Sequence, residues 1–497
     1  MAILGELRKL QQRIGDRRLV QGLLAAVAVA AVASTVLGLV LRDGGSPPRD
    51  EGTTAQLERA AAFGASHVLY RALPGGVVSA AEQTARYRTL VEELSAGSGF
   101  DADLIEALIL LESAGQPDVI AGDDLVNASG LTQILAETAT SFLGMRVDLE
   151  RSRRLTVLIG TAASDGNEFA AEWFRARRRE IDERFDPAKA VAGTLRYLTQ
   201  AYETFGRVDL SLVSYHMGIG NLLGVLRAFA GGSAGTPREL TRNGSLSYAS
   251  LYFSSTPVQH PEAWQRLASL SDDSANYYWK LLAAREIMRL LREDRAGLER
   301  LAALHGRKAS AEEVLHPPES TASFADPDEI EAAWGRDELV RIPHDPERLH
   351  FVVDQTLGEH AAELGREREL YRGLRPDALA VLHHIASEVH TISGVETPLR
   401  VTSAVRDLEY QRVLARYNSQ AARNFSLHTS GFSFDVLREY GSPAQAAAFQ
   451  FVLERFEILG LIAWAREPAA IHITVAADAA ERLWAGGDGA GDQPADR

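Results

Sequence analysis

Hydrophobic residues follow three patterns along the chain, and each predicts a different kind of segment. Residues 20–41 are mostly apolar, with a few polar residues and no charge, and a helix of this length crosses about 30 Å of hydrocarbon. From 81 to 305, apolar residues such as Leu104 and Leu108 recur at three- and four-residue spacing, which is typical of amphipathic helices. Between 366 and 480, one helical pattern is followed by alternating apolar and polar positions, which predict strands.

Charges beside the apolar segment predict how it crosses a membrane. Lysine and arginine outnumber aspartate and glutamate in residues 1–19. The positive-inside rule therefore places residues 1–19 in the cytoplasm and exports the rest of the chain. A cleaved signal peptide is the alternative, but the apolar stretch is longer than a usual signal-peptide core. We therefore expect residues 20–41 to be an uncleaved, single-pass anchor in the cytoplasmic membrane.

Length, cysteine content and charge narrow the class of protein. At 497 residues the chain is too long for one hydrophobic core, so several domains are expected. It has no cysteine, which excludes disulfides and thiolate metal sites. A net charge of -15 argues against nucleic acid, whose phosphates require a basic surface. The composition gives no indication of oligomeric state.

Local composition divides the exported part into domains. Residues 42–80 begin with Gly, Ser and Pro and predict a linker, residues 306–365 contain Pro317-Pro318 and predict a connector, and the glycine-rich residues 481–497 predict a disordered tail. The expected fold class is therefore multidomain: an N-terminal transmembrane helix, an all-α domain over 81–305 and a small α+β domain over 366–480.

Two histidines and an aspartate in the strand-rich region form a candidate metal site. In Phe432 to Val436, polar residues alternate with apolar ones, so a strand places Asp435 on the face opposite the phenylalanines. The same alternation places His472 away from the isoleucines on either side of it. With His428 these residues offer two nitrogens and one oxygen, and an open fourth position is typical of catalytic zinc.

The residues around this site resemble a known enzyme family. Ser426 to Asp435 has the spacing S-x-H-x-x-G-x-x-x-D, and His472 follows on a later strand. Together with Thr402 to Gln411, this pattern resembles the zinc D-Ala-D-Ala peptidases, which have a small α+β fold and act on peptide stems of the bacterial cell wall. The resemblance implies that Zn²⁺ is the cofactor.

The same resemblance implies a role for each matching residue. It makes His428, Asp435 and His472 the metal ligands, Ser426 a substrate-binding residue and Arg406 the group that stabilises a developing oxyanion. The family's general base is a glutamate three residues before the last histidine. Glu467 is the nearest candidate here, but it lies five residues before His472.

The helical region has three motifs of its own. Asp103 to Glu112 forms an amphipathic pattern that ends just before Gly115, a residue suited to stop a helix. Gly130-Leu131-Thr132-Gln133-Ile134 and the segment from Val213 to Asn221 follow. A carboxylate at the end of an apolar helix and facing a cleft can have its pKa raised by desolvation and serve as a general acid, which makes Glu112 a candidate for that role.

In this order the motifs resemble the lytic transglycosylases of the lysozyme-like superfamily. The resemblance implies that Glu112 is the catalytic acid and base, that Gln133 hydrogen-bonds to the glycan and that Tyr215 positions the catalytic carboxylate. His216 stands where the family usually has asparagine. One carboxylate suffices for this chemistry, because the muramyl 6-hydroxyl attacks its own anomeric carbon and yields a 1,6-anhydro product.

A second carboxylate would change the reaction. Asp123 and Asp124 follow Glu112 in a loop, and either one as a partner to Glu112 would make the domain a hydrolytic muramidase instead. The sequence as a whole predicts a membrane-anchored peptidoglycan hydrolase that cleaves both glycan strands and stem peptides. Two alternatives stay open: one domain is catalytic and the other only binds the wall, or the chain is a scaffold of a wall-spanning apparatus.

Overall fold

The chain folds into two compact units, which are described separately. The computed structural model describes residues 51–231, 237–241, 246–270, 273–417 and 426–485. The first unit, here called the helical unit, comprises Pro47–Ala309, and the second, the sheet unit, comprises Ser310–Arg497. The expected cytoplasmic segment 1–19 and membrane span 20–41 lie outside the described residues. Among the helices that the structure does describe, none has the length and apolar character needed to cross a bilayer.

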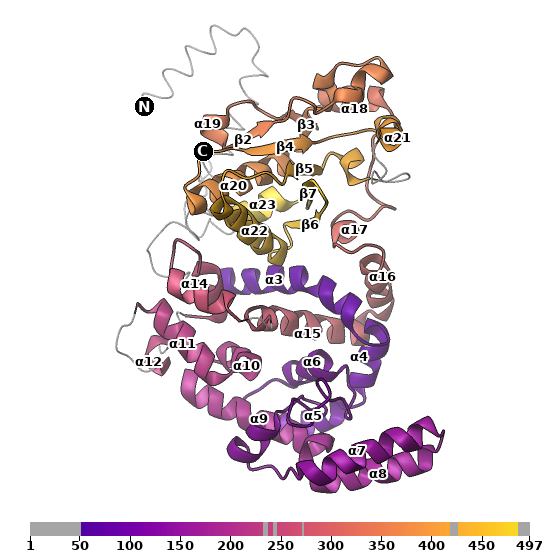
Figure 1. Ribbon diagram of the computed structural model, residues 1–497, viewed down its shortest axis with the longest axis vertical. Coiled ribbons are helices and arrows are strands. Elements are labelled where there is room, and N and C mark those ends of the chain that lie inside the picture. The colour runs from indigo at the N-terminus through magenta and orange to yellow at the C-terminus, as the bar shows by residue number, and fades with distance from the viewer. Residues whose placement is uncertain (1–50, 232–236, 242–245, 271–272, 418–425, 486–497) are drawn as a thin grey trace, which may run out of the picture. The chain divides into compact units, whose positions relative to one another are not determined.

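The helical unit contains fourteen α-helices within its described residues (Figure 1). They are α3 (Glu51–Ala72), α4 (Val77–Ala85), α5 (Arg88–Ser95), α6 (Ala102–Ser113), α7 (Leu149–Ser164), α8 (Glu168–Ile181), α9 (Pro187–Phe205), α10 (Val208–Met217), α11 (Ile219–Phe229), α12 (Pro237–Thr241), α13 (Tyr248–Ser254), α14 (Pro261–Ala268), α15 (Tyr277–Glu293) and α16 (Arg295–His305). Shorter turns are η1 (Thr138–Phe142), η2 (Glu183–Phe185) and η3 (Ser274–Asn276). This agrees with the all-α fold expected for residues 81–305.

Helix α6 lies at the centre of the helical unit. The side chain of Asp101 accepts a hydrogen bond from the backbone N–H of Asp103 and so caps the start of the helix. Ile105 and Leu108 are fully buried, and α6 packs against α4, α5 and α15. The helix ends at Ser113, because Ala114 and then Gly115 adopt left-handed backbone conformations. The predicted helix before Gly115 is confirmed.

The segment expected as a linker differs from the structure. From Glu51 onward, residues 42–80 form α3 and the beginning of α4. Ala61, Ala65 and Leu69 lie on one side of α3 at four-residue spacing and are buried, and this helix packs along α15. Two of these three buried residues are small alanines, so the apolar stripe is too weak in the sequence to stand out from a polar tether.

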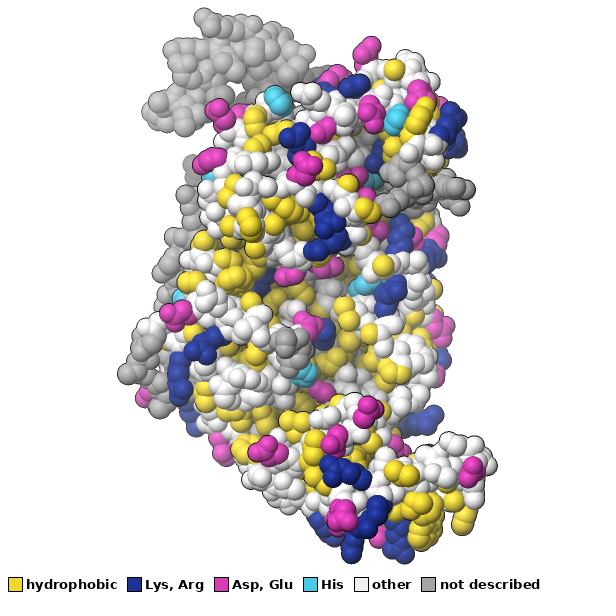
Figure 2. Space-filling view, viewed as in Figure 1, with side chains coloured by type: hydrophobic (Ala, Val, Ile, Leu, Met, Phe, Trp, Pro, Cys, Tyr) yellow, Lys and Arg dark blue, Asp and Glu magenta, His cyan; other side chains and the backbone are white. Residues whose placement is uncertain are grey.

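Helices α7 and α8 form an antiparallel hairpin between the second and third sequence motifs (Figure 1). At its base, Arg178 contacts Asp118 at 2.5 Å and Ser152 donates to Asp182 at 2.9 Å. Phe169 is 86% exposed, and apolar side chains are visible on the hairpin in Figure 2. This ion pair and this hydrogen bond therefore fix the base of the hairpin to the unit.

The sheet unit is an α+β fold, as expected. Its strands are β1 (Val340–Arg341), β2 (Phe351–Val353), β3 (Gly373–Leu374), β4 (Leu399–Ser403), β5 (Ser433–Leu437), β6 (Ile462–Arg466) and β7 (Ala470–Val475). Its helices are α17 (Glu312–Leu315), α18 (Pro327–Gly335), α19 (Pro346–Leu349), α20 (Pro376–Ser393), α21 (Leu408–Tyr417), α22 (Pro443–Ile458) and α23 (Ala479–Ala485), with the turns η4 (Glu359–Leu364), η5 (Arg368–Tyr371) and η6 (Leu427–Ser430).

A five-stranded sheet organises this unit. Its strand order is β2-β4-β5-β7-β6; β2 and β4 run parallel and the other neighbours antiparallel. The register places Asp435 between Ser403 on β4 and His472 on β7. Phe434, Ile471 and Ile473 point into the core and are buried. The strands predicted around Asp435 and His472 are confirmed, and their alternation brings the two polar side chains together.

The ends of the sheet unit differ from the expected domain limits. Helices α17 and α18 and strand β2 fall in the segment expected as a connector, 306–365, yet they belong to the compact unit that begins at Ser310. Helix α23 includes residues 481–485 of the expected tail, and Leu483 is buried. Residues 486–497 lie outside the described part of the chain. Short elements of this kind lack the periodic pattern that identifies longer ones.

Candidate active sites

The first candidate site surrounds Glu112 at the end of α6. Its side chain is partly buried, and desolvation raises the pKa of the carboxyl to about 7 although a hydrogen bond from Tyr277 acts in the opposite direction. The donor is the Tyr277 hydroxyl, 2.8 Å from Oε1. A carboxyl with a pKa near neutrality is able both to give up and to take back a proton during one reaction.

Tyr277 was not among the residues that the sequence motifs indicated. It lies 165 residues from Glu112 in the chain, at the first turn of α15. Its ring stacks on that of His216, with 4.9 Å between ring centroids, and His216 Nδ1 lies 2.9 Å from Ser274 Oγ. Thus the residue that departs from the usual motif supports the tyrosine that contacts the carboxyl.

The loop that carries Gln133 is tied directly to the end of α6. Ser113 donates to the Leu131 carbonyl at 2.7 Å. Gly130 has a φ of 83°, and a Cβ there would lie 1.8 Å from the carbonyl oxygen of Arg184, so a larger residue does not fit. The loop therefore has one arrangement relative to Glu112, which explains the glycine in the second motif.

Gln133 and Tyr215 hold this loop together. The Gln133 amide donates to the carbonyls of Val119 and Gly130 at 3.1 and 2.8 Å. Tyr215 donates to the Thr132 carbonyl at 2.7 Å and lies 3.1 Å from Thr194 Oγ1. Within the described residues, the side chain that hydrogen-bonds to Glu112 is Tyr277 instead of the expected Tyr215. Tyr215 is still close enough that the charge of Glu112 adds to burial in raising its pKa.

Asp123 and Asp124 have the environment of surface carboxylates. Both are exposed. Asp124 accepts hydrogen bonds from Arg153 at 2.8 Å and from the backbone N–H of Val126 at 3.1 Å. The bond from Arg153 is the main reason that its pKa is lowered. Asp124 thus lacks the desolvated environment of Glu112.

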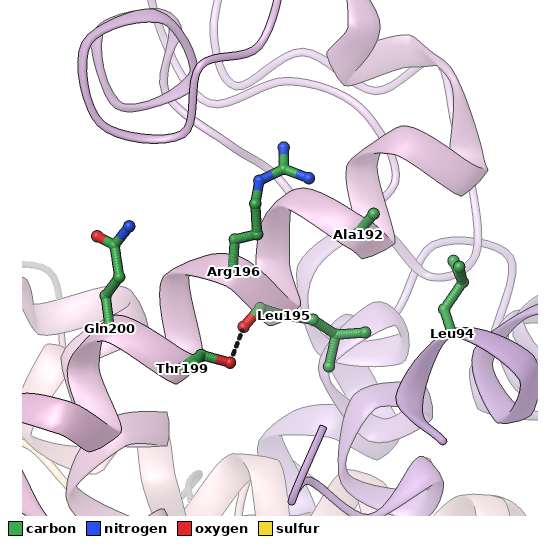
Figure 3. Close-up of a pocket in the computed structure, with 6 residues that line it drawn as sticks. All are labelled: Leu94, Ala192, Leu195, Arg196, Thr199 and Gln200. Carbon is green, nitrogen blue, oxygen red and sulfur yellow. Dashed lines mark hydrogen bonds between the residues drawn. The ribbon is translucent and has the colours of Figure 1, made fainter. Parts of the chain in front are cut away.

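A separate hollow lies between α5 and α9. Its volume is about 400 Å³, and Figure 3 shows Leu94 facing it from α5 while Leu195, Arg196 and Thr199 line it from α9. Thr199 uses its hydroxyl to donate to the Leu195 carbonyl at 2.8 Å. None of the residues of the three motifs lines this hollow, so it is not part of the Glu112 site.

The second candidate site is formed by His428, Asp435 and His472. Within the described residues, one potential ligand atom from each side chain lies within 4.8 Å of the others. Asp435 Oδ1 is 3.2 Å from His428 Nε2 and 2.8 Å from His472 Nδ1. Burial favours the neutral carboxyl, but the two histidines outweigh it and hold the pKa of Asp435 well below its usual range. The predicted trio therefore does converge.

The protonation of His428 tests whether a cation fits between these groups. Its Nδ1 lies 2.8 Å from the backbone carbonyl of Ala404, and because a carbonyl only accepts, Nδ1 must carry the proton. Burial, followed by the charge of Arg406, lowers the pKa of His428 to about 4. At neutral pH its Nε2 is therefore a lone pair that faces a carboxylate oxygen. Two acceptors at this distance can both bind one cation placed between them, so the residues fit a metal ion.

The chemistry of the donors also matches the predicted metal. Two imidazole nitrogens and one carboxylate oxygen are ligands that Zn²⁺ accepts in catalytic sites.

The second nitrogen of His472, Nε2, lies 3.0 Å from Glu312 Oε1. Burial disfavours protonation of this ring, yet Asp435 and Glu312 together raise the pKa of His472 to about 10. Glu312 belongs to α17 and was not indicated by any sequence motif.

Arg406 points at the same carboxylate. Its Nη2 lies 3.4 Å from Asp435 Oδ2 and 2.5 Å from Ser403 Oγ, and its Nη1 donates to Gln411 at 3.1 Å. The following residue, Asp407, is fully buried and accepts from the Tyr371 hydroxyl at 2.8 Å and from the Tyr410 N–H at 2.7 Å. Asp407 thereby fixes the turn between β4 and α21 that carries Arg406.

Ser426 and Gly431 bound the turn that carries His428. Ser426 is buried, and its carbonyl oxygen accepts from both the N–H and the hydroxyl of Thr429, at 2.9 and 2.6 Å. Gly431 has a φ of 80°, and a Cβ there would lie 3.1 Å from Leu339. Arg375 donates to the Ser430 carbonyl at 3.1 Å. These contacts fix the turn and hence the ring of His428.

Glu467 lies at the turn between β6 and β7. It is exposed, and its N–H donates to the Ala470 carbonyl at 2.9 Å. Partial desolvation and then the charge of Asp435 raise the pKa of the Glu467 carboxyl, while His472 and Arg406 act in the opposite direction. Ala470 and His472 share one side of β7 because side chains alternate along a strand. The hairpin turn therefore brings Glu467 toward the trio despite its five-residue spacing.

Comparison with known proteins bears on the helical unit. The family described as the transglycosylase SLT domain matches residues 166–231, which include α9, α10, α11 and the third motif with Tyr215. Residues 166–231 of the helical unit therefore match a lysozyme-like domain of the lytic transglycosylase type, and a domain of this type implies peptidoglycan as its substrate. The match does not extend into Ser310–Arg497. No curated protein matches the chain.

Proposed function

We propose that the helical unit is a lytic transglycosylase in which Glu112 is the catalytic acid and base. The observation that carries this proposal is the partly buried carboxyl with a pKa of about 7, held by Tyr277 at the end of α6. Support comes from the match of the transglycosylase SLT domain, which covers the third motif. A glutamate of ordinary pKa would be almost entirely ionised at neutral pH and would be a poor proton donor.

In the proposed reaction, Glu112 first protonates the glycosidic oxygen as the bond to the leaving sugar breaks. The resulting carboxylate then accepts the proton of the muramyl 6-hydroxyl as that oxygen attacks the anomeric carbon. Tyr277 stabilises the transient anion by the hydrogen bond that it already donates to Oε1. The exposed, ion-paired Asp124 is poorly suited to be a second catalytic carboxylate, which favours the anhydro product over simple hydrolysis.

Digestion of purified peptidoglycan by residues 43–497 tests this proposal, with mass analysis of the released fragments. Wild-type protein should release fragments with 1,6-anhydromuramic ends, and Glu112→Gln should release none. Asp123→Asn and Asp124→Asn are matched controls and should leave the products unchanged. In a different outcome, the wild-type fragments carry reducing ends instead of anhydro ends. If substitution of Asp123 or Asp124 then abolishes these products, the enzyme is a hydrolytic muramidase.

We infer a second activity for the sheet unit: zinc-dependent cleavage of peptidoglycan stem peptides. The observation that favours it is the pair of acceptors, His428 Nε2 and Asp435 Oδ1, that face each other at 3.2 Å. His428, Asp435 and His472 would hold Zn²⁺, which when bound polarises a carbonyl and lowers the pKa of a water molecule. Arg406 would orient the substrate carbonyl, Glu467 would take up the proton of the attacking water, and Ser426 would border the peptide.

The competing interpretations of the sheet unit predict different products. A peptidase should shorten stem peptides in a way that chelators abolish. A wall-binding module or a scaffold component should instead sediment with peptidoglycan and leave every stem peptide intact, even when zinc is supplied. Mass analysis of muropeptides after incubation with and without Zn²⁺ distinguishes these functions.

We propose that residues 20–41 anchor both units to the outer face of the cytoplasmic membrane. The support is the uncharged apolar run that follows an arginine-rich N-terminus. Tethering to one membrane would raise the effective concentration of both sites near the wall. A C-terminal tag should be digested by protease added to intact spheroplasts. If the tag resists digestion until the membrane is lysed, the chain has the opposite orientation to the one proposed.

A further inference from the structure

Helix α17 contributes a buried carboxylate to the side of His472 that faces away from Asp435. Glu312 is 5% exposed, and its Oε1 lies 3.0 Å from His472 Nε2. The other nitrogen of the same ring, Nδ1, lies 2.8 Å from Asp435 Oδ1. The two carboxylates therefore contact opposite nitrogens of one imidazole.

This arrangement determines which nitrogen of His472 is available to a metal. Asp435 Oδ1 is also the atom nearest His428 Nε2, at 3.2 Å, so a metal held by all three residues must lie on the Nδ1 side of His472. A neutral imidazole that gives its Nδ1 lone pair to a metal carries its proton on Nε2. That proton points to a carboxylate, which only accepts.

A second acceptor lies close to the same nitrogen. Thr474 Oγ1 is 3.3 Å from His472 Nε2, but the same hydroxyl is 2.8 Å from Ser433 Oγ. Glu312 is nearer and charged, so its hydrogen bond to Nε2–H is the stronger one. The two negative charges of Asp435 and Glu312 also balance the two positive charges of a divalent ion. The positive charge of Arg406 is then available to interact with the substrate.

We propose that Glu312 is a positioning residue that holds Nε2–H of His472 and thereby presents Nδ1 to the metal. The proposal rests on the proposed metal site of the sheet unit. A carboxylate behind a ligating histidine fixes the ring and increases its basicity, and loss of such a partner typically weakens metal binding by about 10–100-fold. The peptidase activity of this chain then depends on a helix far upstream of the ligands.

The test measures Zn²⁺ affinity of the otherwise intact protein by competition with a chromogenic chelator. Glu312→Ala should weaken binding by about 10–100-fold. Glu312→Gln should weaken it less, because its amide oxygen still accepts from Nε2–H although the charge is gone. Glu313→Gln, which changes the neighbouring buried carboxylate of α17, is the matched control and should bind zinc as wild type does.

A second readout separates positioning from a general effect on folding. In zinc-loaded wild type, the Nε2–H of His472 should exchange slowly with solvent by NMR, and in Glu312→Ala it should exchange rapidly at unchanged melting temperature. If wild type binds zinc and Glu312→Ala binds it equally tightly, the role of Glu312 is refuted while the metal site stands. If wild type binds no zinc, both the metal site and the role of Glu312 are refuted.

Discussion

The two candidate sites shift the pKa of a carboxyl group in opposite directions. Around Glu112, desolvation dominates and one neutral hydroxyl contacts the side chain, so the pKa rises to about 7. Around Asp435, the two histidines outweigh burial, so the pKa of this carboxyl falls well below its usual range. The same kind of side chain thus changes its charge near neutral pH in the helical unit, as a proton carrier would, and stays ionised in the sheet unit, as a permanent anion does.

This difference indicates which measurements report on each site. A proton carrier reveals itself in the pH dependence of the reaction and of stability, because its charge changes within the working range. A permanent anion that helps to hold a cation reveals itself in metal content. The predictions below use this contrast, beginning with the change that should have the largest effect.

Removal of a ligand should abolish the function of the sheet unit and leave that of the helical unit intact. We expect His428→Ala to lose bound zinc and stem-peptide cleavage together, because three ligands and a water offer no redundancy. Elemental analysis and muropeptide products check both. His344→Ala, at an exposed histidine of the same unit, is the control and should retain both properties. Simultaneous loss of glycan cleavage in His428→Ala would show that the two activities are not independent.

Loss of the proposed base should separate rate from metal binding. Glu467→Ala should reduce stem-peptide cleavage on the order of 10²–10⁴-fold and leave one zinc per chain, since Glu467 is not one of the trio. Glu439→Ala, which removes an exposed carboxylate after β5, is the control. Full activity in Glu467→Ala would place the base elsewhere.

Removal of the Tyr277 hydroxyl should raise the pKa of Glu112 further and so increase the difference between the two sites. Tyr277→Phe deletes the hydrogen bond that lowers the pKa of Glu112. The alkaline limb of the pH–rate profile for glycan cleavage should therefore move to higher pH. The maximal rate should fall by about 10–100-fold, because a hydrogen bond to a charged group contributes about 1.5–3 kcal/mol. Tyr278→Phe removes a hydroxyl that contacts Glu58 instead and should leave the limb in place. An unshifted limb in Tyr277→Phe would exclude Glu112 as the titrating group.

Local sequence patterns predicted the parts of both sites that lie on regular elements. The helix that ends at Glu112 and the strands that carry Asp435 and His472 follow from apolar periodicity, and alternation along two strands is enough to bring Asp435 beside His472. The helical content of residues 81–305 was predictable for the same reason. These features depend on neighbours in the chain, which the sequence displays directly.

The supporting residues could not be predicted in this way. Tyr277 reaches Glu112 across 165 residues, and Glu312 reaches His472 from a helix of a single turn. Neither carries a motif, and each depends on how distant elements pack. Helix α3 was missed for a related reason, because its buried side includes small alanines such as Ala61 and Ala65. The sequence thus indicated the proposed reacting groups better than the residues that contact and support them.

The smallest expected effect concerns stability, and it follows from the raised pKa of Glu112. In the unfolded chain this carboxyl ionises near pH 4.5, whereas in the folded protein it ionises near pH 7. Between these values the folded state holds more protons than the unfolded state, so the free energy of unfolding falls as pH rises. Glu112→Gln carries no charge and avoids this loss. We expect the variant to be more stable than wild type by about 1–2 kcal/mol at pH 8, allowing for partial exposure, and equal to it at pH 4. Thermal unfolding at both pH values measures the difference. Equal stability at pH 8 would mean that Glu112 ionises without cost in the folded protein, and it would remove the physical basis for its role as a general acid.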